Sequence, residues 1–537
     1  MKRKAAERDR ILENAWIFLA VIILGVVITV RIRLLGIPLE RDEGEYAYAG
    51  QLMLQGIPPY KLAYNMKFPG TYAAYALIMT MFGQTIVGIH VGLLLVNAAT
   101  IFLIFLLGRQ LINAIAGIAA AMTYAVLCVS PSVLGFAAHA SHFVMLPVLA
   151  GTLLLLNESD GRTFQRLFVS GLTFGIGLLM KQPAVFFVLF GALYLLTNDL
   201  RRKRGWKRVV LRNLTFDLGA AVPFGLVCLF LWRAGVFDKF WFWTINYARQ
   251  YGTLVPFSLG AKLFSKTASD VISSTWALWI LAALGVIWGF WDKRMRGSAV
   301  FLAGFLAFSL VAFSAGFYFR EHYYIFVVPA VSLFAGVAIS TVSDLANRRG
   351  NLVRLAPLLL ICAALGQPIL AARKFYFEFS PVEVSRMIYG ANPFSESVRV
   401  AQHLRDHTEA SDTIAVLGSE PEIYFYSKRH SATGYIYTYG LMEPQSFARQ
   451  MQEEMIRQIE SGRPKYLIFV SAPTSWLRRP ESDGMIFAWA TDYIDKFYEI
   501  VGLVNILSPD HTDYYFDQLP NTMPELANYI LIYRRKS

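Results

Sequence analysis

Residues 15–371 contain one apolar stretch after another, and many of these stretches reach the length that can cross a membrane. A helix needs about 20 residues to span a hydrocarbon core of roughly 30 Å. Only 16% of the 537 residues are charged, whereas soluble domains carry about 25%. The deficit is not uniform, because residues 372–537 have an ordinary soluble composition. The sequence therefore predicts a polytopic α-helical membrane domain over residues 1–371 and a C-terminal soluble domain over residues 372–537.

We expect about eleven transmembrane helices, and the charges of their connections predict the orientation. The predicted spans are 14–35, 85–107, 114–131, 142–157, 166–181, 183–198, 214–233, 271–291, 299–317, 323–343 and 352–371. The connections 199–213, 292–297 and 343–354 are rich in Lys and Arg, which the positive-inside rule places in the cytoplasm. The N-terminus is then cytoplasmic, and the C-terminal domain lies outside the cell inner (plasma) membrane.

The net charge of +13 does not indicate a nucleic-acid partner. The densest basic block, within residues 201–212, lies between two apolar spans. Anionic lipid headgroups are the expected neighbours of such a block. We therefore predict membrane lipids as partners and no nucleic acid.

The first outer loop, residues 36–84, contains two short, weakly amphipathic stretches at 44–55 and 71–83. Each is too short to cross a membrane, so both are predicted to be amphipathic helices lying in the interface. Tyrosines are enriched at the headgroup level of membranes. The loop tyrosines expected there are Tyr46, Tyr48, Tyr60, Tyr64, Tyr72 and Tyr75. A second outer segment, residues 234–270, is also rich in aromatic residues.

The C-terminal domain alternates strand-like and helix-like stretches. Residues 413–418 and 466–470 are predicted to be buried strands, and residues 529–535 another strand. Residues 444–462 have the pattern of an amphipathic helix that ends at Gly462. This alternation predicts a small α/β domain. Its sequence contains neither a Gly-rich phosphate loop nor the pattern of a catalytic triad.

An acidic cluster follows directly on the first span. Asp42 and Glu43 are its central members, and Lys67 lies in the same outer loop. The ordinary role of such a cluster is a solvated helix N-terminus, where carboxylates complement exposed N–H groups. Lys67 and the surrounding aromatic residues favour a functional role. A carboxylate would then act as general base on an acceptor hydroxyl, or a pair would hold a divalent cation; the spacing alone leaves both open.

Two further polar sets lie at the outer ends of spans. Lys181 has apolar neighbours on both sides. A lone lysine in this position commonly snorkels, whereas the phosphate of a membrane lipid would match its charge. Arg320, His322 and Tyr323 form the other set. Arg320 can form a simple ion pair with Glu321, but the set as a whole suits phosphate recognition because Arg binds phosphate bidentately.

His139, Ser141 and His142 form a fourth set at the start of the fourth span. Two histidines three residues apart on a helix can bind a metal, but no third ligand is near in sequence. We assign no metal; the residues available to a divalent ion are Asp42, Glu43 and His142. All four sets fall on the outer face of the predicted topology, as expected of an active site at the membrane surface.

The DE pair at residues 42–43 and the K-x-P sequence at residues 67–69 resemble the GT-C glycosyltransferases, as do KQ at 181–182 and REHYY at 320–324. The closest groups are the family 39 protein O-mannosyltransferase-like enzymes and the bacterial lipid A aminoarabinose transferases. The resemblance covers the whole chain in order, although each motif is short. It implies transfer of a sugar from a polyprenyl-phosphate carrier, undecaprenyl phosphate in bacteria, to an acceptor on the outer side.

The resemblance also implies roles for individual residues. Asp42 matches the catalytic aspartate, as base or metal-site residue, and Glu43 is its acidic partner. The residues that would bind the lipid phosphate and neutralise this leaving group are Lys67, Lys181, Arg320 and His322, with Tyr323 beside them. Many relatives have a second acidic residue where this chain has Ser141 or a histidine. This departure puts a two-carboxylate mechanism in doubt and leaves a different acceptor or metal use as alternatives.

Two other functions are alternatives to an inverting, lipid-linked glycosyltransferase. A transporter or flippase of lipid-linked sugars should carry ionisable residues near mid-span or broken helices in paired positions, whereas the charges here lie mainly at span ends. The intact DE and K-x-P motifs argue against a non-catalytic protein that binds a partner through its C-terminal domain. The glycosyltransferase is therefore predicted. The sugar, the acceptor (protein, lipid or glycan) and the oligomeric state stay open.

Overall fold

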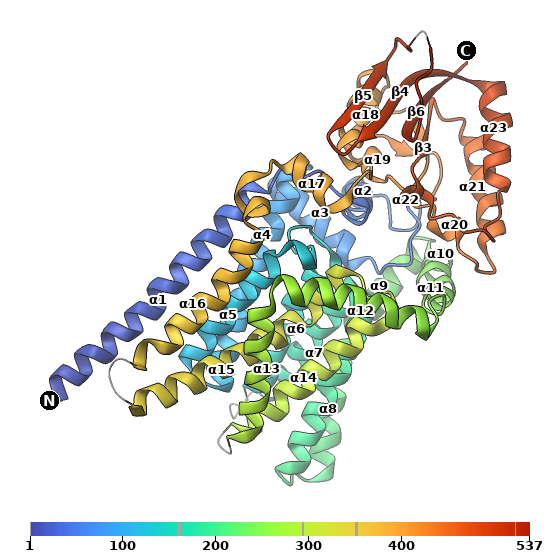
Figure 1. Cartoon of the computed structure of the whole chain (residues 1–537). Coiled ribbons are helices and arrows are strands. Elements are labelled where there is room, and N and C mark those ends of the chain that lie inside the picture. The colour runs from blue at the N-terminus through green and yellow to red at the C-terminus, as the bar shows by residue number, and fades with distance from the viewer. Residues whose placement is uncertain (1, 158–162, 293–294, 350–352, 521, 537) are drawn as a thin grey trace. The chain divides into compact units, whose positions relative to one another are not determined.

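The computed structural model of the chain describes residues 2–157, 163–292, 295–349, 353–520 and 522–536 (Figure 1). The predicted cytoplasmic connections 292–297 and 343–354 therefore lie partly outside the described residues. The orientation that rests on them stays a prediction.

The chain forms two compact units, each assembled from three segments. Unit 1 comprises Met1–Leu34, Val91–Val227 and Val255–Glu378, and unit 2 comprises Leu35–His90, Cys228–Leu254 and Phe379–Ser537. The first outer loop thus belongs to the same unit as the C-terminal segment. The predicted boundary at residue 371, between a membrane and a soluble domain, stays a prediction.

The described regular structure of unit 1 is entirely helical. Its α-helices are α1 (Lys2–Arg33), α4 (Ile86–Leu111), α5 (Ala114–Val129), α6 (Ala140–Leu156), α7 (Thr163–Met180), α8 (Val185–Arg201), α9 (Trp206–Arg233), α12 (Phe257–Ser274), α13 (Trp276–Trp291), α14 (Arg296–Ser314), α15 (Val328–Arg349) and α16 (Ala356–Ala371), with α4 beginning in unit 2 and α9 ending there. Its short helical segments are η1 (Pro131–Val133), η2 (Gln182–Ala184), η4 (Ala315–Phe317), η5 (Glu321–Phe326), η6 (Val353–Leu355) and η7 (Lys374–Glu378).

Several helices have the length and composition of membrane spans. Within the described residues, 8 helices pass this test, or 9 if α12 and α13, which meet at a 99° bend, form one span. The chain is thus a multi-pass membrane protein, and the predicted polytopic helical fold is confirmed. Two predicted spans correspond to the shorter α5 and α6, of 16 and 17 residues. The predicted number of eleven spans stays a prediction.

Glycines, which have no side chain, allow α15 of unit 1 to pack closely against its neighbours. α15 packs against α5 and α13. A Cβ at Gly336 would lie 2.4 Å from the carbonyl oxygen of Ala116, and one at Gly285 would lie 1.8 Å from that of Phe334. Because helices in a membrane associate chiefly by close packing, small residues at such crossings bring the backbones together.

Unit 2 combines helices with one sheet. Its helices are α2 (Arg41–Leu54), α3 (Gly70–Phe82), α10 (Phe237–Trp241), η3 (Phe242–Tyr247), α11 (Ala248–Tyr251), α17 (Pro381–Tyr389), α18 (Phe394–Asp406), α19 (Glu422–Ser427), α20 (Tyr439–Met442), α21 (Ala448–Gly462), α22 (Pro473–Trp476) and α23 (Met485–Phe497). Its strands are β1 (Thr413–Leu417), β2 (His430–Ser431), β3 (Tyr466–Ser471), β4 (Tyr498–Ser508), β5 (His511–Phe516) and β6 (Asn528–Arg535).

The six strands form a mixed sheet in the order β2-β1-β3-β6-β4-β5. Figure 1 labels β3, β4, β5 and β6 of this sheet. β1 pairs in parallel with β2 and β3, and the remaining pairs are antiparallel. α21 buries Met451, Met455 and Ile459, which recur every four residues along one helical face. The C-terminal α/β fold, the predicted strands and the helix end at Gly462 are thereby confirmed. The hairpin formed by β4 and β5 was not among the predicted strands.

The tyrosines of the first outer loop are buried, which corrects their predicted placement at the headgroup level. All six have at most 7% of their surface exposed. Tyr48 stacks on Tyr424, 5.1 Å between ring centroids, and Tyr64 packs edge-to-face on Tyr435 at 5.3 Å. The partners of Tyr48 and Tyr64 come from the C-terminal segment of unit 2, more than 350 residues later in the sequence, whereas Tyr46 packs on Tyr72 and Tyr75 of the same loop.

Candidate active site

Asp42 lies in the first turn of α2, and Lys67 holds its carboxylate. Lys67 Nζ donates to Asp42 Oδ1 at 2.8 Å and to Glu45 Oε2 at 3.0 Å. The side chains of Lys67 and Asp42 are 12% and 13% exposed, and that of Glu45 is 1% exposed. Two predicted site residues are thus in direct contact, and one ammonium serves two carboxylates.

Glu45 is surrounded by hydrogen-bond donors. Besides Lys67, Asn65 Nδ2 and the hydroxyl of Tyr72 each donate to it at 2.6 Å. Burial outweighs these donors and raises the pKa of Glu45 above its ordinary value, while Lys67 and the hydrogen bond from Tyr72 oppose the shift. Lys67 also lies 4.6 Å from the ring centroid of Tyr46, where the aromatic face attracts the cation.

The charge of Lys67 is stabilised by its neighbours. Although burial opposes this charge, the carboxylates of Asp42 and Glu45 raise the pKa of Lys67 well above its ordinary value. Lys67 is therefore an ammonium ion at neutral pH, and its charge favours ionised Asp42. The hydroxyl of Tyr437 lies 3.5 Å from the same oxygen, Asp42 Oδ1. The Lys67 ammonium, at 2.8 Å, fixes the direction of the Asp42 carboxylate, and the more distant Tyr437 hydroxyl lies beside the same oxygen.

Glu43 takes part in a different set of contacts. Its Oε2 accepts from the Glu40 N–H at 3.3 Å, and Glu40 Oε1 accepts from the Glu43 N–H at 3.0 Å, which makes a capping box for α2. Its Oε1 lies 3.0 Å from His90 Nε2, and His90 Nδ1 lies 2.8 Å from the carbonyl oxygen of Leu35. Because both ring nitrogens face acceptors, the protonated ring can donate from both. These contacts anchor the start of α2, and the role of Glu43 as acidic partner of Asp42 stays a prediction.

The contacts of the two carboxylates bear on the divalent-cation alternative. A cation shared by Asp42 and Glu43 needs both carboxylates directed at one point. Lys67 orients the first carboxylate, whereas His90 and the helix cap orient the second. This arrangement favours Asp42 as a base over a cation shared with Glu43. A cation that involves His142 stays untested.

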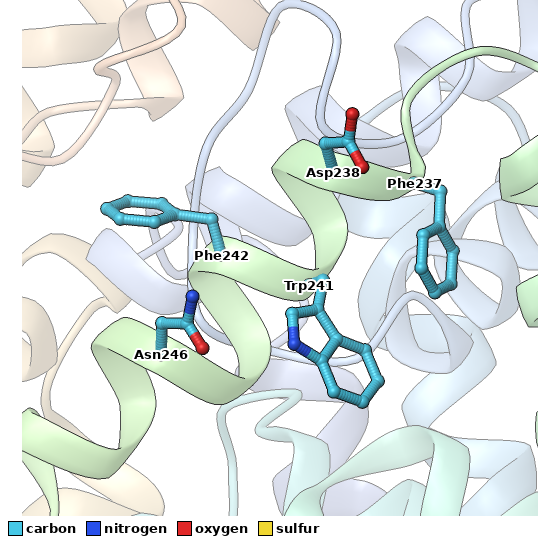
Figure 2. Close-up of a pocket in the computed structure, with 5 residues that line it drawn as sticks. All are labelled: Phe237, Asp238, Trp241, Phe242 and Asn246. Atoms are coloured by element: carbon cyan, nitrogen blue, oxygen red, sulfur yellow. The ribbon is translucent and has the colours of Figure 1, made fainter.

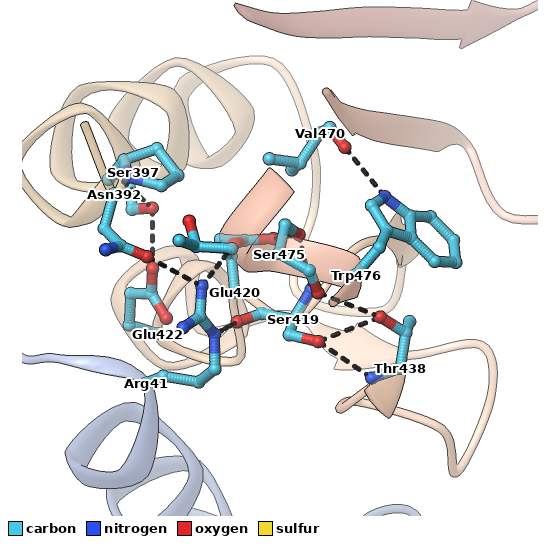
Figure 3. A network of polar contacts seen from close by, with 12 residues as sticks. Arg41, Asn392, Ser397, Ser419, Glu420, Glu422, Thr438, Val470, Ser475 and Trp476 are labelled. Carbon is cyan, nitrogen blue, oxygen red and sulfur yellow. Dashed lines mark hydrogen bonds and ion pairs between the residues drawn. The ribbon is translucent and has the colours of Figure 1, made fainter. Parts of the chain in front are cut away.

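Arg41, the neighbour of Asp42, is anchored to the segment that follows β1 (Figure 3). Its Nε donates to the carbonyl oxygen of Ser419 at 2.5 Å, and its Nη2 donates to Glu420 Oε1 at 3.1 Å. Ser475 Oγ donates to the other oxygen of Glu420 at 2.7 Å. The Glu420 side chain is fully buried. The position of the first turn of α2 therefore depends on the sheet of unit 2.

A second group of predicted residues meets in unit 1. The rings of His139 and His322 are stacked, with centroids 4.0 Å apart. Lys181 Nζ lies 4.0 Å from the ring centroid of Tyr323, which in turn packs edge-to-face on His322 at 4.7 Å. Four residues from three separate segments of the sequence thus converge. The aromatic ring holds the lysine cation by a cation–π interaction.

The other predicted residues of unit 1 have separate surroundings. The guanidinium of Arg320 lies 5.7 Å from the ring centroid of Tyr318. Ser141 and His142 are buried in the first turn of α6. His142 Nδ1 lies 3.8 Å from the sulfur of Cys128, so its described polar contact is to a thiol rather than to a carboxylate.

A pocket of about 410 Å³ lies along α10 and η3, in the aromatic second outer segment (Figure 2). Its lining residues are Phe237, Asp238, Trp241, Phe242 and Asn246. All five come from one continuous helical stretch, and the lining contains no predicted site residue. The pocket therefore adds no member to the candidate active site.

Comparison with known proteins bears on the fold of the chain. Residues 67–226 match the model of the dolichyl-phosphate-mannose-protein mannosyltransferase family. ArnT from Cupriavidus metallidurans, solved with bound undecaprenyl phosphate, superposes with a TM-score of 0.58 at 16% identity, over 85% of this chain and 93% of ArnT. The chain has the GT-C fold. The oligosaccharyltransferase AglB from Archaeoglobus fulgidus, solved with an inhibitory peptide and a dolichol-phosphate, gives 0.55 at 13% identity, over 94% of this chain and 75% of AglB. A search of curated protein sequences finds no match.

The GT-C resemblance expected from the short motifs is thus confirmed at the level of fold. Sequence reasoning missed Arg41, Glu420 and Tyr437. Glu420 carried a usable signal, because it follows a predicted buried strand and functional groups gather at the carboxyl ends of parallel strands. Arg41 and Tyr437 carried no comparable signal.

Glu422, two residues beyond Glu420, makes the stability of this GT-C chain depend on pH. Burial, and then the charge of Glu420, raise the pKa of Glu422 to about 8, against about 4.3 for an unfolded glutamate. Between these values the folded chain holds one extra proton, so this group's contribution to stability falls as pH rises. Glu422→Gln should flatten that fall, because the amide does not titrate. Thermal unfolding from about pH 5 to about pH 9 measures it.

The exposed Glu481 supplies the control for this experiment. Glu481→Gln should leave the pH dependence of the unfolding temperature as in the wild type. Equal slopes for wild type and Glu422→Gln would contradict the assignment of a raised pKa to Glu422.

Proposed function

We propose that this GT-C protein transfers a sugar from a polyprenyl-phosphate-linked donor to an acceptor on the extracytoplasmic side of the inner membrane. The observation that carries the proposal is the contact of Lys67 with Asp42 and Glu45 at the start of α2. The fold adds support, since solved relatives of similar fold hold undecaprenyl phosphate or dolichol-phosphate. The sequence resemblance assigns the catalytic aspartate to the same residue, Asp42.

Asp42 is proposed to act on the acceptor. The acceptor hydroxyl attacks the anomeric carbon, its proton passes to Asp42, and the bond between the sugar and the phosphate oxygen breaks. Polyprenyl phosphate leaves from the opposite face, which inverts the configuration of the sugar. Lys67 and Tyr437 hold the carboxylate before the reaction begins, so little reorganisation is needed at the transition state.

Lys67 is assigned to Asp42 rather than to the phosphate. Its ammonium already donates to two carboxylates, and a phosphate would have to compete with both. The leaving phosphate gains negative charge during transfer, so it needs cations elsewhere. We assign that role to Lys181, Arg320 and His322, with Tyr323 holding the Lys181 cation by its ring face.

Replacing Lys181 by Gln tests the donor site. One charge-assisted interaction with a phosphate contributes about 1.5–3 kcal/mol, so affinity for polyprenyl phosphate should fall about tenfold to a hundredfold. Native mass spectrometry of the purified protein with undecaprenyl phosphate measures this affinity.

Lys496 provides a matched control, since it is another lysine beside an aromatic ring, 5.1 Å from that of Phe497 in unit 2. Lys496→Gln should bind undecaprenyl phosphate as the wild type does. Unchanged affinity in Lys181→Gln would remove Lys181 from the proposed donor site.

A further inference from the structure

Two histidines and an aspartate lie together at one end of the sheet of unit 2, with no part in the proposed transfer. His403 and His407 are one turn apart at the end of α18, with ring centroids 4.2 Å apart. The ring of His403 also stacks on Phe516, at 4.7 Å and an interplanar angle of 11°. Phe516 is the last residue of β5, and the next residue, Asp517, therefore also lies near the two histidines.

Asp517 adopts a backbone conformation that is unusual for a residue with a side chain. Its φ is 63°, in the left-handed region. Its N–H donates to the carbonyl oxygen of Val501 at 3.0 Å, which holds the turn against β4. Aspartate is among the few residues that tolerate this conformation, and the turn directs its carboxylate to the two histidines.

The distances within the cluster suit ligands of a shared metal ion better than hydrogen bonds. Asp517 Oδ2 lies 3.9 Å from His403 Nδ1 and 3.6 Å from His407 Nε2. Hydrogen bonds to oxygen from nitrogen rarely exceed about 3.2 Å. Two ligands bound tetrahedrally to zinc at about 2.0–2.1 Å lie about 3.3–3.5 Å apart. One possible ligand atom of each residue can be chosen so that the three atoms all lie within 4.8 Å of one another.

The hydrogen bonds of the two rings point to a missing partner. His407 Nδ1 lies 2.8 Å from the carbonyl oxygen of His403; when Nδ1 donates there, the lone pair of Nε2 faces Asp517. Such a second contact is the usual way in which proteins orient a metal-binding histidine. His403 is 7% exposed, and its Nδ1 lies 3.9 Å from Asp517 Oδ2, beyond hydrogen-bond distance.

We propose that His403, His407 and Asp517 bind one divalent transition-metal cation of the zinc class. Two imidazoles and one carboxylate are borderline donors that suit Zn²⁺ and exclude Ca²⁺ and Mg²⁺, which prefer oxygen. The ion joins the end of α18 to the turn after β5 and so stabilises the fold of unit 2. This site is independent of the proposed sugar transfer.

Metal binding to the full-length protein in detergent tests the proposal. After removal of bound metal with a chelator, titration with Zn²⁺ by calorimetry, and with Co²⁺ by visible absorption, should give one site. His407→Asn and Asp517→Asn should each weaken it by about tenfold or more, since even indirect partners of a metal ligand contribute that much. Both side chains are about half exposed, so these replacements leave the core intact, and gel filtration checks this.

His511 supplies the matched control. It is an exposed histidine on β5 that lies 3.1 Å from Asp513 but outside the cluster. His511→Gln should bind the metal as the wild type does, and zinc should raise the unfolding temperature of both but not of His407→Asn. Zinc binding that survives in His407→Asn and Asp517→Asn, or a wild-type protein that binds no zinc at micromolar concentrations, would overturn the proposal.

Discussion

Replacing Asp42 by Asn is expected to abolish sugar transfer while leaving the protein folded and able to bind the lipid phosphate. Removing a general base costs about 10²–10⁴ in rate. The substitution keeps the shape of the side chain, and Lys67 retains its contact with Glu45 at 3.0 Å. Loss of activity would therefore reflect the missing proton acceptor rather than a collapsed loop.

The Asp42 experiment has a matched control in Asp238. This aspartate lies in the second outer segment of unit 2, in the lining of the aromatic pocket (Figure 2). Asp238→Asn should transfer sugar at the wild-type rate. If Asp42→Asn keeps transfer within a few-fold of wild type, Asp42 is not the base. If it loses both transfer and lipid binding, its role is structural.

Replacing Lys67 by Met is expected to have the largest effect on stability, and to abolish transfer as well. The methionine fills a similar volume but leaves Asp42 and Glu45 without their shared cation. Breaking a buried ion pair on one side costs about 3–5 kcal/mol, because the remaining charge is uncompensated. The midpoint of thermal or denaturant unfolding measures the loss of stability, and donor turnover measures the loss of activity.

Lys239 and Glu45 supply the controls for this prediction. Lys239 pairs with Glu454 at 2.5 Å, but its side chain is 40% exposed. Lys239→Met should thus cost no more than about 1 kcal/mol. Adding Glu45→Gln to Lys67→Met removes one uncompensated carboxylate and should recover part of the lost stability. A Lys67→Met protein as stable as the wild type would show that the ammonium does not compensate the two carboxylates.

The membrane helices and the first strands could be predicted because their signals are local. Apolar runs mark helices such as α4 and α9 without reference to the rest of the chain. β1 and β3 are short apolar runs in a polar neighbourhood, so they also stand out. β5 could not be found in this way, since HTDYYF has no continuous apolar face and is stabilised by pairing with β4.

Residues of the candidate site were predicted one by one along the chain, but a contact between two of them was predictable only within one loop. Asp42 and Lys67 are 25 residues apart in one loop, and their contact follows from that loop. Arg41 and Glu420 are 379 residues apart, and no pattern in the sequence relates them. Tyr48 and Tyr64 were misplaced for the same reason, because their partners Tyr424 and Tyr435 become neighbours only when unit 2 assembles.

The most direct test of the account is donor turnover by the wild-type protein in liposomes. The protein is supplied with a polyprenyl-phosphate-linked sugar and with candidate protein, lipid and glycan acceptors on the outer side. Free polyprenyl phosphate and movement of the donor between leaflets are followed together. The account predicts release of polyprenyl phosphate, matched by sugar on an acceptor and absent in Asp42→Asn. Movement of the intact donor between leaflets without any transfer would contradict it and identify a transporter instead.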